Sequence, residues 1–378
     1  MGKISRMLTG AVGLTLAAVS IAGAPPPVAA VAPTGADAAA TGETTPAADA
    51  AAAAPVLGDP AATPTTGTST STTGTATTGT STTGTSTAGA TECSGRRPRA
   101  AGTVNRSLER NGYHRTYVLH VPPGYDPTVA TPVVVLLHGQ GSYGIQQLIY
   151  SGYGALADRE GFLVLAPDTA YPTVNQWLIG SGPGATPWVD PRVDDVGFVR
   201  VLLDRLSAQF CVDTHRVFAT GISSGGFMAS YLACRLPGRI ASVVTVAATV
   251  YSDDAEDCAT PRPVPVLAFH GTADRNVPFD HQTFGVAGPN DGVVANVRRW
   301  ATRRNGCTGA STVTQLAPDV SRRSWDCPSG QPARLVRIQG GGHTWPGSPI
   351  DVPSLGVTTH SVSATAMGWR FFQANPMP

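Results

Sequence analysis

Six short apolar runs constrain the fold of this chain more than any other feature of its sequence. They cover residues 132–139, 161–168, 215–223, 241–248, 264–271 and 333–340, and most of them end in Gly, Asp or Ser. Continuous apolar runs rich in β-branched residues are typical of strands buried on both faces, as in a parallel sheet. A further run, residues 115–121, alternates apolar and polar residues like an exposed strand.

Helix-like segments separate these runs, at about residues 144–160, 194–210, 224–236, 291–304 and 361–374. The clearest is 194–210, which has Asp194 as N-cap and places on one stripe the side chains of Val196, Val199, Leu203, Leu206 and Phe210. This alternation predicts an α/β fold, with a mostly parallel central sheet and helices on both faces. Ligands of such sheets bind beyond the carboxyl ends of the strands.

Residues 1–30 have the pattern of a signal peptide. Lys3 and Arg6 precede an apolar stretch, and the small residues 28–30 offer a cleavage site. A membrane anchor is the alternative, but the apolar stretch is short and interrupted by glycine for a spanning helix. We therefore expect a secreted, extracellular protein without stable membrane association, in which the six cysteines form disulfides.

Residues 31–92 consist almost entirely of Ala, Thr, Pro, Gly and Ser. Their threonine-rich repeat has no large apolar residue whose burial could offset the entropy of ordering the chain, so we expect a disordered linker. A threonine-rich β-solenoid is the structured alternative, and it would have nothing with which to form a core. The composition changes at Cys93, and we predict one domain over residues 93–378.

Charge and cysteine spacing argue against two classes of function. The formal net charge is +1, whereas a nucleic-acid-binding protein carries a basic face. The cysteines include no C-x-x-C pair of the kind that binds zinc. We expect a monomer that needs no metal, cofactor or nucleic-acid partner.

Residues Gly221-Ile222-Ser223-Ser224-Gly225 match the pattern G-x-S-x-G between a predicted strand and a predicted helix. A sharp turn at that place strains the serine backbone and lifts its hydroxyl above the sheet, so Ser223 is the candidate nucleophile. The next amide, that of Ser224, lies at a helix N-terminus and is a candidate oxyanion donor. The plainer interpretation is a glycine-rich turn with a capping serine.

A serine nucleophile needs a base, and the base needs an acid that fixes its tautomer. In this arrangement the chain order is serine, acid, histidine. His343 follows a predicted strand in the glycine-rich segment QGGGHTWPG and is the candidate base. The other histidines after Ser223 are His270, His281 and His360. Of these, His270 precedes the best acid and so breaks the expected order, and His360 lies in a segment, TTHS, that is typical of the start of a helix.

The acid is expected in the loop after the preceding strand, which supplies Asp274, with Asp280 as the fallback. An acidic cluster at 253–257 lies in the previous loop, and we interpret it as solvated surface. The sequence therefore predicts a catalytic triad of Ser223, Asp274 and His343.

The second oxyanion donor is expected in the loop after an early strand. The segment LLHGQGSYG ends that strand at His138 and Gly139, so the amide of Gln140 is the candidate. His138 precedes the serine in the chain, so we expect it to shape this loop. Loss of one such donor typically lowers kcat by about 10²–10³.

The motifs LHGQGS, REGFLVLAPD, CVDTHRVFATGISSGGFMA, PVPVLAFHGTADRNVPF and GGGHTWPG resemble those of secreted poly(3-hydroxybutyrate) depolymerases. They resemble equally the feruloyl and acetylxylan esterases of carbohydrate esterase family one. The resemblance runs from about Cys93 to the C-terminus, and it implies an α/β-hydrolase fold with Ser223, Asp274 and His343 as the triad. The family's early loop often has a small residue where this chain has Gln140, which leaves the backbone role intact but bears on the pocket wall.

The resemblance also implies how the six cysteines pair. The pairs are Cys93 with Cys211, Cys234 with Cys258, and Cys307 with Cys327. The last pair brackets a small excursion between a helix and the last strand, and closing a loop of that length contributes about 3 kcal/mol.

Three tryptophans are candidates for the substrate-binding pocket. Trp177 and Trp188 lie in the Pro- and Gly-rich segment 169–194, and Trp345 follows His343 by two residues. Long loops above an active face often form binding walls, and aromatic walls suit an apolar acyl group. The alternative is that these tryptophans pack the loops down.

The sequence thus predicts a secreted serine ester hydrolase that acts through an acyl-enzyme. Its expected substrates are oligoesters of the poly(3-hydroxybutyrate) type, or feruloyl or acetyl esters of plant polysaccharide. A non-catalytic surface module and a peptidase on the same fold are the alternatives.

Overall fold

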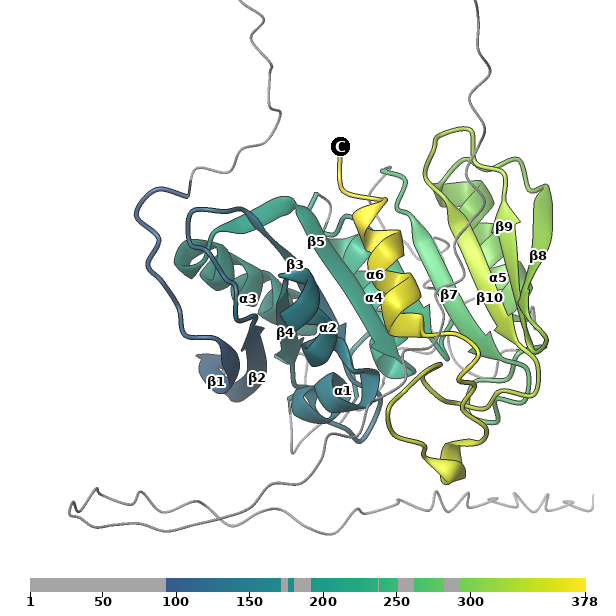
Figure 1. Cartoon of the computed structure of the whole chain (residues 1–378), viewed down its shortest axis with the longest axis horizontal. Helices are drawn as coiled ribbons and strands as arrows, with labels where there is room; N and C mark the ends of the chain where they lie inside the picture. Colours follow the sequence, from purple (N-terminus) through teal and green to yellow (C-terminus); the bar gives the residue numbers. More distant parts are fainter. Residues whose placement is uncertain (1–92, 171–175, 180–191, 237, 251–261, 282–291) are drawn as a thin grey trace, which may run out of the picture. The chain divides into compact units, whose positions relative to one another are not determined.

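The computed structural model describes residues 93–170, 176–179, 192–236, 238–250, 262–281 and 292–378, which form a ten-stranded sheet flanked by helices (Figure 1). In chain order the strands are β1 (Gly102–Arg110), β2 (Tyr113–Val121), β3 (Thr131–Leu137), β4 (Leu163–Pro167), β5 (Val212–Ile222), β6 (Val243–Val246), β7 (Val266–Gly271), β8 (Ser311–Ala317), β9 (Val320–Trp325) and β10 (Ala333–Ile338). Across the sheet their order is β1-β2-β4-β3-β5-β6-β7-β10-β9-β8.

The central strands, from β4 through β3, β5, β6 and β7 to β10, run parallel. Antiparallel pairs extend the sheet at both edges, with β2 and β1 beyond β4, and β9 and β8 beyond β10. Because parallel strands end at the same edge, the loops after β3, β5, β7 and β10 gather there. The predicted fold class, an α/β-hydrolase type of sheet, is confirmed.

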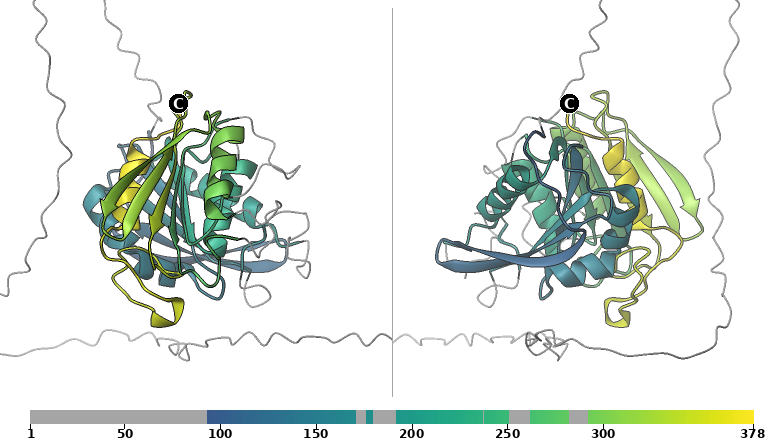
Figure 2. Two further views of the ribbon diagram at one scale, coloured as in Figure 1. Left: turned by 90° about the vertical axis from the view of Figure 1, so that its right-hand side faces the viewer. Right: turned by 60° about the vertical axis from the view of Figure 1, so that its left-hand side comes forward.

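Helices cover both faces of the sheet, as the side views in Figure 2 show. On one face lie α1 (Gly144–Ser151), α2 (Tyr153–Glu160) and α6 (Ala364–Gln373). On the other lie α3 (Asp195–Gln209), α4 (Ser224–Arg235) and α5 (Val293–Arg299), which continues as a π-helix over Trp300–Arg304. In the described part of the chain, no helix has the length and apolar character needed to cross a membrane.

The central strands are buried on both of their faces, which explains their continuous apolar sequences. In β3, Val133 and Val135 belong to the core under α3 and α4, whereas Val134 and Leu136 belong to the core under α1, α2 and α6. All four side chains are 0% exposed. A strand in this position has no solvent-facing side on which polar residues could alternate.

Three strands, β1, β8 and β9, are absent from the sequence prediction. They form the antiparallel edges, where most of their residues are exposed or half-buried and polar, so no apolar run marks them. The predicted helix at 144–160 is two helices, because Gly152 takes a left-handed conformation with φ 71° and ends α1. Asp194 caps α3 as predicted, accepting a hydrogen bond from the Gly197 amide at 2.7 Å.

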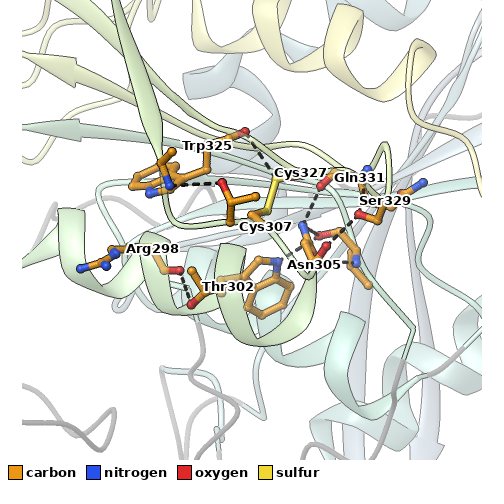
Figure 3. The surroundings of a disulfide bond; sticks show 12 residues. Arg298, Thr302, Asn305, Cys307, Trp325, Cys327, Ser329 and Gln331 are labelled. Atoms are coloured by element: carbon orange, nitrogen blue, oxygen red, sulfur yellow. Dashed lines mark hydrogen bonds between the residues drawn. A yellow bond between two sulfur atoms is a disulfide. The ribbon is translucent and has the colours of Figure 1, made fainter.

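Two of the three implied disulfides, Cys93–Cys211 and Cys307–Cys327, are present among the described residues. Cys258 lies outside the described residues, so its pairing with Cys234 stays a prediction. The Cys307–Cys327 bond closes the base of the β8–β9 hairpin (Figure 3). Beside it the buried Asn305 side chain donates to the carbonyl of Val264 and accepts from its amide, both at 2.9 Å.

Removal of this disulfide is expected to destabilise the domain. Replacing Cys307 and Cys327 together by Ser frees a loop with a sequence separation of 20 residues in the unfolded chain. The free energy of unfolding is expected to fall by about 3 kcal/mol. Urea unfolding followed by tryptophan fluorescence measures it, and an unchanged midpoint with an unchanged slope would contradict the expectation.

Candidate active site

Ser223 forms the turn between β5 and α4. Its backbone has φ 55° and ψ −127°, a conformation that non-glycine residues rarely adopt and that costs about 1–3 kcal/mol. The Ser223 amide donates to the carbonyl of Val246 at 3.0 Å, and its carbonyl accepts from the amides of Gly226 and Phe227. The surrounding bonds therefore hold the strained serine at the carboxyl end of β5.

The glycines on either side of Ser223 are required by close approach of the backbone. A Cβ on Gly221 would lie 2.5 Å from the carbonyl carbon of Gly225. A Cβ on Gly225 would overlap the carbonyl oxygens of Leu137 and His138 at the end of β3. The turn can therefore be this tight only with glycine at both positions.

Of the two predicted oxyanion donors, Ser224 follows Ser223 in the chain and Gln140 lies in the loop after β3. A Cβ on Gly139 would lie 3.5 Å from the Ser223 Cβ, so the loop after β3 lies directly against the serine. Within the described residues, neither the amide of Ser224 nor that of Gln140 donates a hydrogen bond. Neither N–H group is therefore engaged by another part of the described chain.

His138 is fully buried and shapes the loop that carries Gln140, as predicted. Its Nδ1 donates to the carbonyl of Gly139 at 2.7 Å, and its Nε2 accepts from the amide of Thr169 at 3.3 Å. Burial lowers the pKa of His138, which favours this neutral tautomer. The indole N–H of Trp177 donates to the His138 carbonyl at 2.9 Å and fixes the backbone at the same place.

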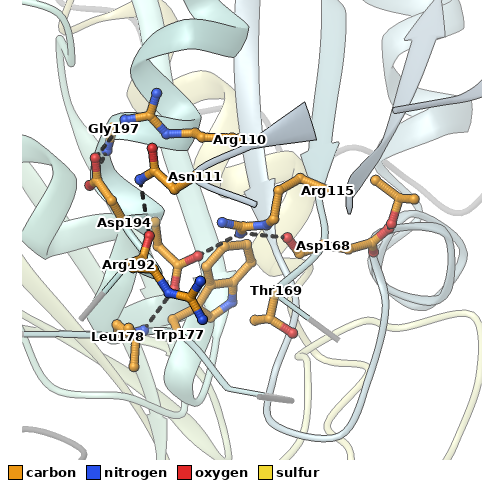
Figure 4. Close-up of polar contacts among 12 residues, drawn as sticks. Arg110, Asn111, Arg115, Asp168, Thr169, Trp177, Leu178, Arg192, Asp194 and Gly197 are labelled. Carbon is orange, nitrogen blue, oxygen red and sulfur yellow. Dashed lines mark hydrogen bonds and ion pairs between the residues drawn. The ribbon is translucent and has the colours of Figure 1, made fainter. Parts of the chain in front are cut away.

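Asp168 holds the far end of this loop. One carboxylate oxygen accepts from the amide of Gly144 at 2.6 Å, and the other accepts from the hydroxyl of Thr116 at 2.6 Å. The carbonyl of Asp168 accepts a hydrogen bond from Arg115 (Figure 4), whose guanidinium also pairs with Asp195 at 2.5 Å. The side chains of Arg115 and Asp195 are almost completely buried.

The Arg115–Asp195 pair was not predicted, because nothing in the sequence around either residue distinguishes it. Burial raises the pKa of Asp195, and the charge of Arg115 opposes this effect. The second carboxylate oxygen of Asp195 accepts from the amide of Leu178 at 2.9 Å, and the Arg115 guanidinium lies over the ring of Phe198. The pair thus joins β2 to the start of α3 and, through the Asp168 carbonyl, to the end of β4.

Asp274 and His343 lie together, as predicted. The Nδ1 of His343 donates to the Oδ2 of Asp274 at 2.8 Å, and the two side chains are 7% and 0% exposed. The Oδ1 of Asp274 accepts from the amides of Asn276 at 2.9 Å and Val277 at 2.8 Å. These backbone donors stabilise a carboxylate that water does not reach.

The loops after β7 and β10 are joined through their backbones. The amide of Ala273 donates to the carbonyl of Gly341 at 2.9 Å, and a Cβ on Gly271 would overlap that same peptide group. The His343 amide donates to the carbonyl of Leu355 at 2.7 Å. The glycine-rich segment before His343 therefore serves close packing of two loops, which places the histidine over the acid.

The structure brings Asp274 and His343 into contact, and it places Ser223 at the same edge of the sheet. In the described part of the chain, no hydrogen bond joins the Ser223 hydroxyl to His343. Three of the alternatives lie elsewhere: His281 and Asp280 are exposed, and His360 pairs with Asp351 at 3.1 Å on the surface.

The prediction that Trp177 and Trp345 line the substrate-binding pocket is wrong. Their side chains are 2% and 0% exposed, so they offer no surface to a substrate. The indole of Trp345 packs edge-to-face on Tyr153 and donates to the hydroxyl of Thr365 at 2.8 Å. Both tryptophans pack their loops onto the sheet, and Trp188 lies outside the described residues.

Comparison with known proteins identifies the family. The sequence matches the family described as Esterase PHB depolymerase over residues 115–261. It is 30% identical over 243 residues to feruloyl esterase D of Neurospora crassa, a match that covers 62% of this chain and 75% of that enzyme. The chain belongs to this esterase family. The predicted enzyme class, an ester hydrolase, is thereby confirmed.

Three further similarities are found, two in sequence and one in structure. The esterase is 31% identical over 301 residues to NocK of Nocardia uniformis subsp. tsuyamanensis, a protein named as an esterase, over 71% of this chain and 82% of that protein. It is 30% identical over 237 residues to feruloyl esterase B of Piromyces equi, of which it covers 42%. Among solved structures, the acetyl xylan esterase of Aspergillus awamori aligns with a TM-score of 0.49 at 16% identity, over 72% of this chain and 99% of that one.

Replacing Arg115 by Met is expected to lower the free energy of unfolding by about 3–5 kcal/mol, because Asp195 would be left buried without its counter-charge. Adding Asp195→Leu to this variant is expected to restore part of the loss. The neighbouring pair Arg110–Asp194, at 2.6 Å with side chains 20% and 42% exposed, supplies the control.

In that control, Arg110→Met is expected to cost about 1 kcal/mol or less, because solvent screens the exposed pair. Urea unfolding of the three variants measures these differences. Equal losses for Arg115→Met and Arg110→Met would contradict a special role for the buried pair.

Proposed function

We propose that this esterase acts through an acyl-enzyme on Ser223, with His343 as the base and Asp274 as the acid that orients it. The observation that carries the proposal is the 2.8 Å hydrogen bond between His343 and Asp274, which lie 69 positions apart in the chain. Because the proton of the imidazole is held on Nδ1, Nε2 keeps the lone pair that accepts the proton of Ser223.

The reaction proceeds in two halves. The Ser223 hydroxyl oxygen attacks the ester carbonyl carbon while its proton passes to the Nε2 of His343. The tetrahedral intermediate then expels the alcohol, which leaves with that proton, and acyl-Ser223 remains. Water attacks the acyl carbon with His343 again as base, and the carboxylic acid and free serine are released.

The amides of Ser224 and Gln140 stabilise the negative charge that develops on the carbonyl oxygen. Their N–H groups come from two elements that meet at Ser223, the first turn of α4 and the loop after β3. The N-terminus of α4 adds a partial positive charge at this point. The buried contacts of His138 and Asp168 hold the Gln140 loop in place, so little reorganisation accompanies the reaction.

The substrates are feruloyl or acetyl esters of plant polysaccharide, with oligoesters of 3-hydroxybutyrate as the second candidate. The names of two relatives, feruloyl esterases B and D, support the first. The name of the family supports the second. The enzyme works as a monomer outside the cell after removal of residues 1–30, and the two disulfides among the described residues fit an oxidising compartment.

Ser223→Ala and Ser224→Ala form a matched pair that tests the nucleophile. With p-nitrophenyl butyrate, Ser223→Ala is expected to lower kcat by about 10⁴-fold or more, because the attacking atom is lost. Ser224→Ala keeps its backbone N–H, and it removes a buried hydroxyl that has no hydrogen-bond partner within the described residues. Its kcat is expected to stay close to wild type. Activity that survives in Ser223→Ala would refute the assignment.

A single assay series tests the substrate class. Values of kcat/KM for methyl ferulate, acetylated xylan and 3-hydroxybutyrate oligomers are compared under the same conditions, with Ser223→Ala as the blank. One of the first two substrates is expected to be cleaved most efficiently. A preference for the hydroxybutyrate oligomers would assign the enzyme to the second class, and cleavage of casein in place of all three would indicate a peptidase.

A further inference from the structure

A second histidine, His270, lies against the acid of the proposed triad. It is the penultimate residue of β7, and its side chain is 0% exposed. The Nε2 lies 2.8 Å from the carbonyl oxygen of Val277 and 3.5 Å from the Oδ2 of Asp274. The ring of Phe279 packs edge-to-face against the imidazole.

His270 and Asp274 hold the same peptide segment from two sides. The carbonyl of Val277 accepts the Nε2–H of His270, while the amide of Val277 donates to the Oδ1 of Asp274 at 2.8 Å. Together these contacts fix the turn after β7 to the strand from which it departs. The Oδ2 of Asp274 then faces both His270 and His343.

The charge state of His270 matters because two imidazoles approach one carboxylate. Burial and the nearby His343 lower the pKa of His270, whereas Asp274 raises it, and the net direction is downward. Asp274 and His343 are the titratable groups that face His270 within the described residues. A neutral His270 donates one hydrogen bond and leaves the full charge of Asp274 to His343.

The other nitrogen of His270 supports a functional reason for its presence. Its Nδ1 is buried and faces the backbone of Ala248, with which it makes no hydrogen bond of ordinary geometry. An unsatisfied buried nitrogen costs about 1–3 kcal/mol, and an apolar ring of similar size would avoid this cost. Such a replacement would lose the hydrogen bond from Nε2 to the Val277 carbonyl, so this bond is the feature that a histidine provides here.

We infer that His270 is a positioning residue: its Nε2–H fixes the turn at Val277 and thereby aims the Asp274 carboxylate at His343. The inference rests on the proposed triad and extends it by a fourth side chain, which does not touch the substrate. Without this hydrogen bond the carboxylate loses its alignment, and it stabilises the protonated form of His343 less.

Two variants separate this role from simple packing. His270→Phe fills the same space without a hydrogen-bond donor. If the Phe variant does not fold, His270→Leu is used in its place. His270→Gln retains an N–H at a similar reach from the backbone. For each, kcat and KM for p-nitrophenyl butyrate are measured from about pH 5 to 9, and rates are expressed per active site titrated with a fluorophosphonate.

The donor-free variant is expected to lose about 10- to 100-fold in kcat with KM little changed, as misplacement of a catalytic group does. The acidic limb of its kcat/KM profile is expected to move to lower pH, because His343 then gives up its proton more readily. His270→Gln is expected to recover most of the rate and the wild-type position of the limb.

Two results would overturn the inference. One is a donor-free variant whose rate per active site and acidic limb match the wild type. The other is an equal loss in the Gln and Phe variants, which would show that the imidazole acts through its shape alone. Failure of the triad has a different signature, because Asp274→Asn would then keep wild-type activity, and the role of His270 would be refuted with it.

Discussion

At the turn between β5 and α4, the helix backbone lies so close to the carbonyl of Leu137 in β3 that only glycine fits at position 225. This close approach places a strained serine at the carboxyl end of β5, above a sheet in which both neighbouring strands are parallel to β5. Because the strands end at one edge, the loops that carry Gln140, Asp274 and His343 can reach the same place. The geometry of the site thus follows from a backbone contact and from strand direction.

The polar groups behind this edge are arranged in fixed pairs. On one side Arg115, Asp195 and Asp168 anchor the early loop through buried hydrogen bonds. On the other side Asp274 is held by two backbone amides and lies beside His270. A buried charge that lost its partners would destabilise the fold. Because the observed arrangement of the loops brings these partners together, the network favours that arrangement. A preorganised site of this kind has little to rearrange when charge develops on a substrate.

Much of this architecture was predictable from the sequence, for physical reasons that differ between its parts. The parallel strands are buried on both faces, so their apolar runs are continuous, and the contact of Asp274 with His343 was expected from chain order. The edge strands β1, β8 and β9 face solvent and carry no such signal. The burial of Trp345 and the ion pair of Arg115 depend on tertiary neighbours, which spacing along the chain does not encode.

The most direct test of the account is a crystal structure of the esterase after reaction with a fluorophosphonate. The account predicts phosphorus bonded to the Ser223 hydroxyl oxygen, the phosphoryl oxygen roughly 3 Å from the amides of Ser224 and Gln140, and the Nε2 of His343 within hydrogen-bond reach of the same centre. A label on another residue, or a His343 side chain that remains out of reach of the labelled serine, would contradict it.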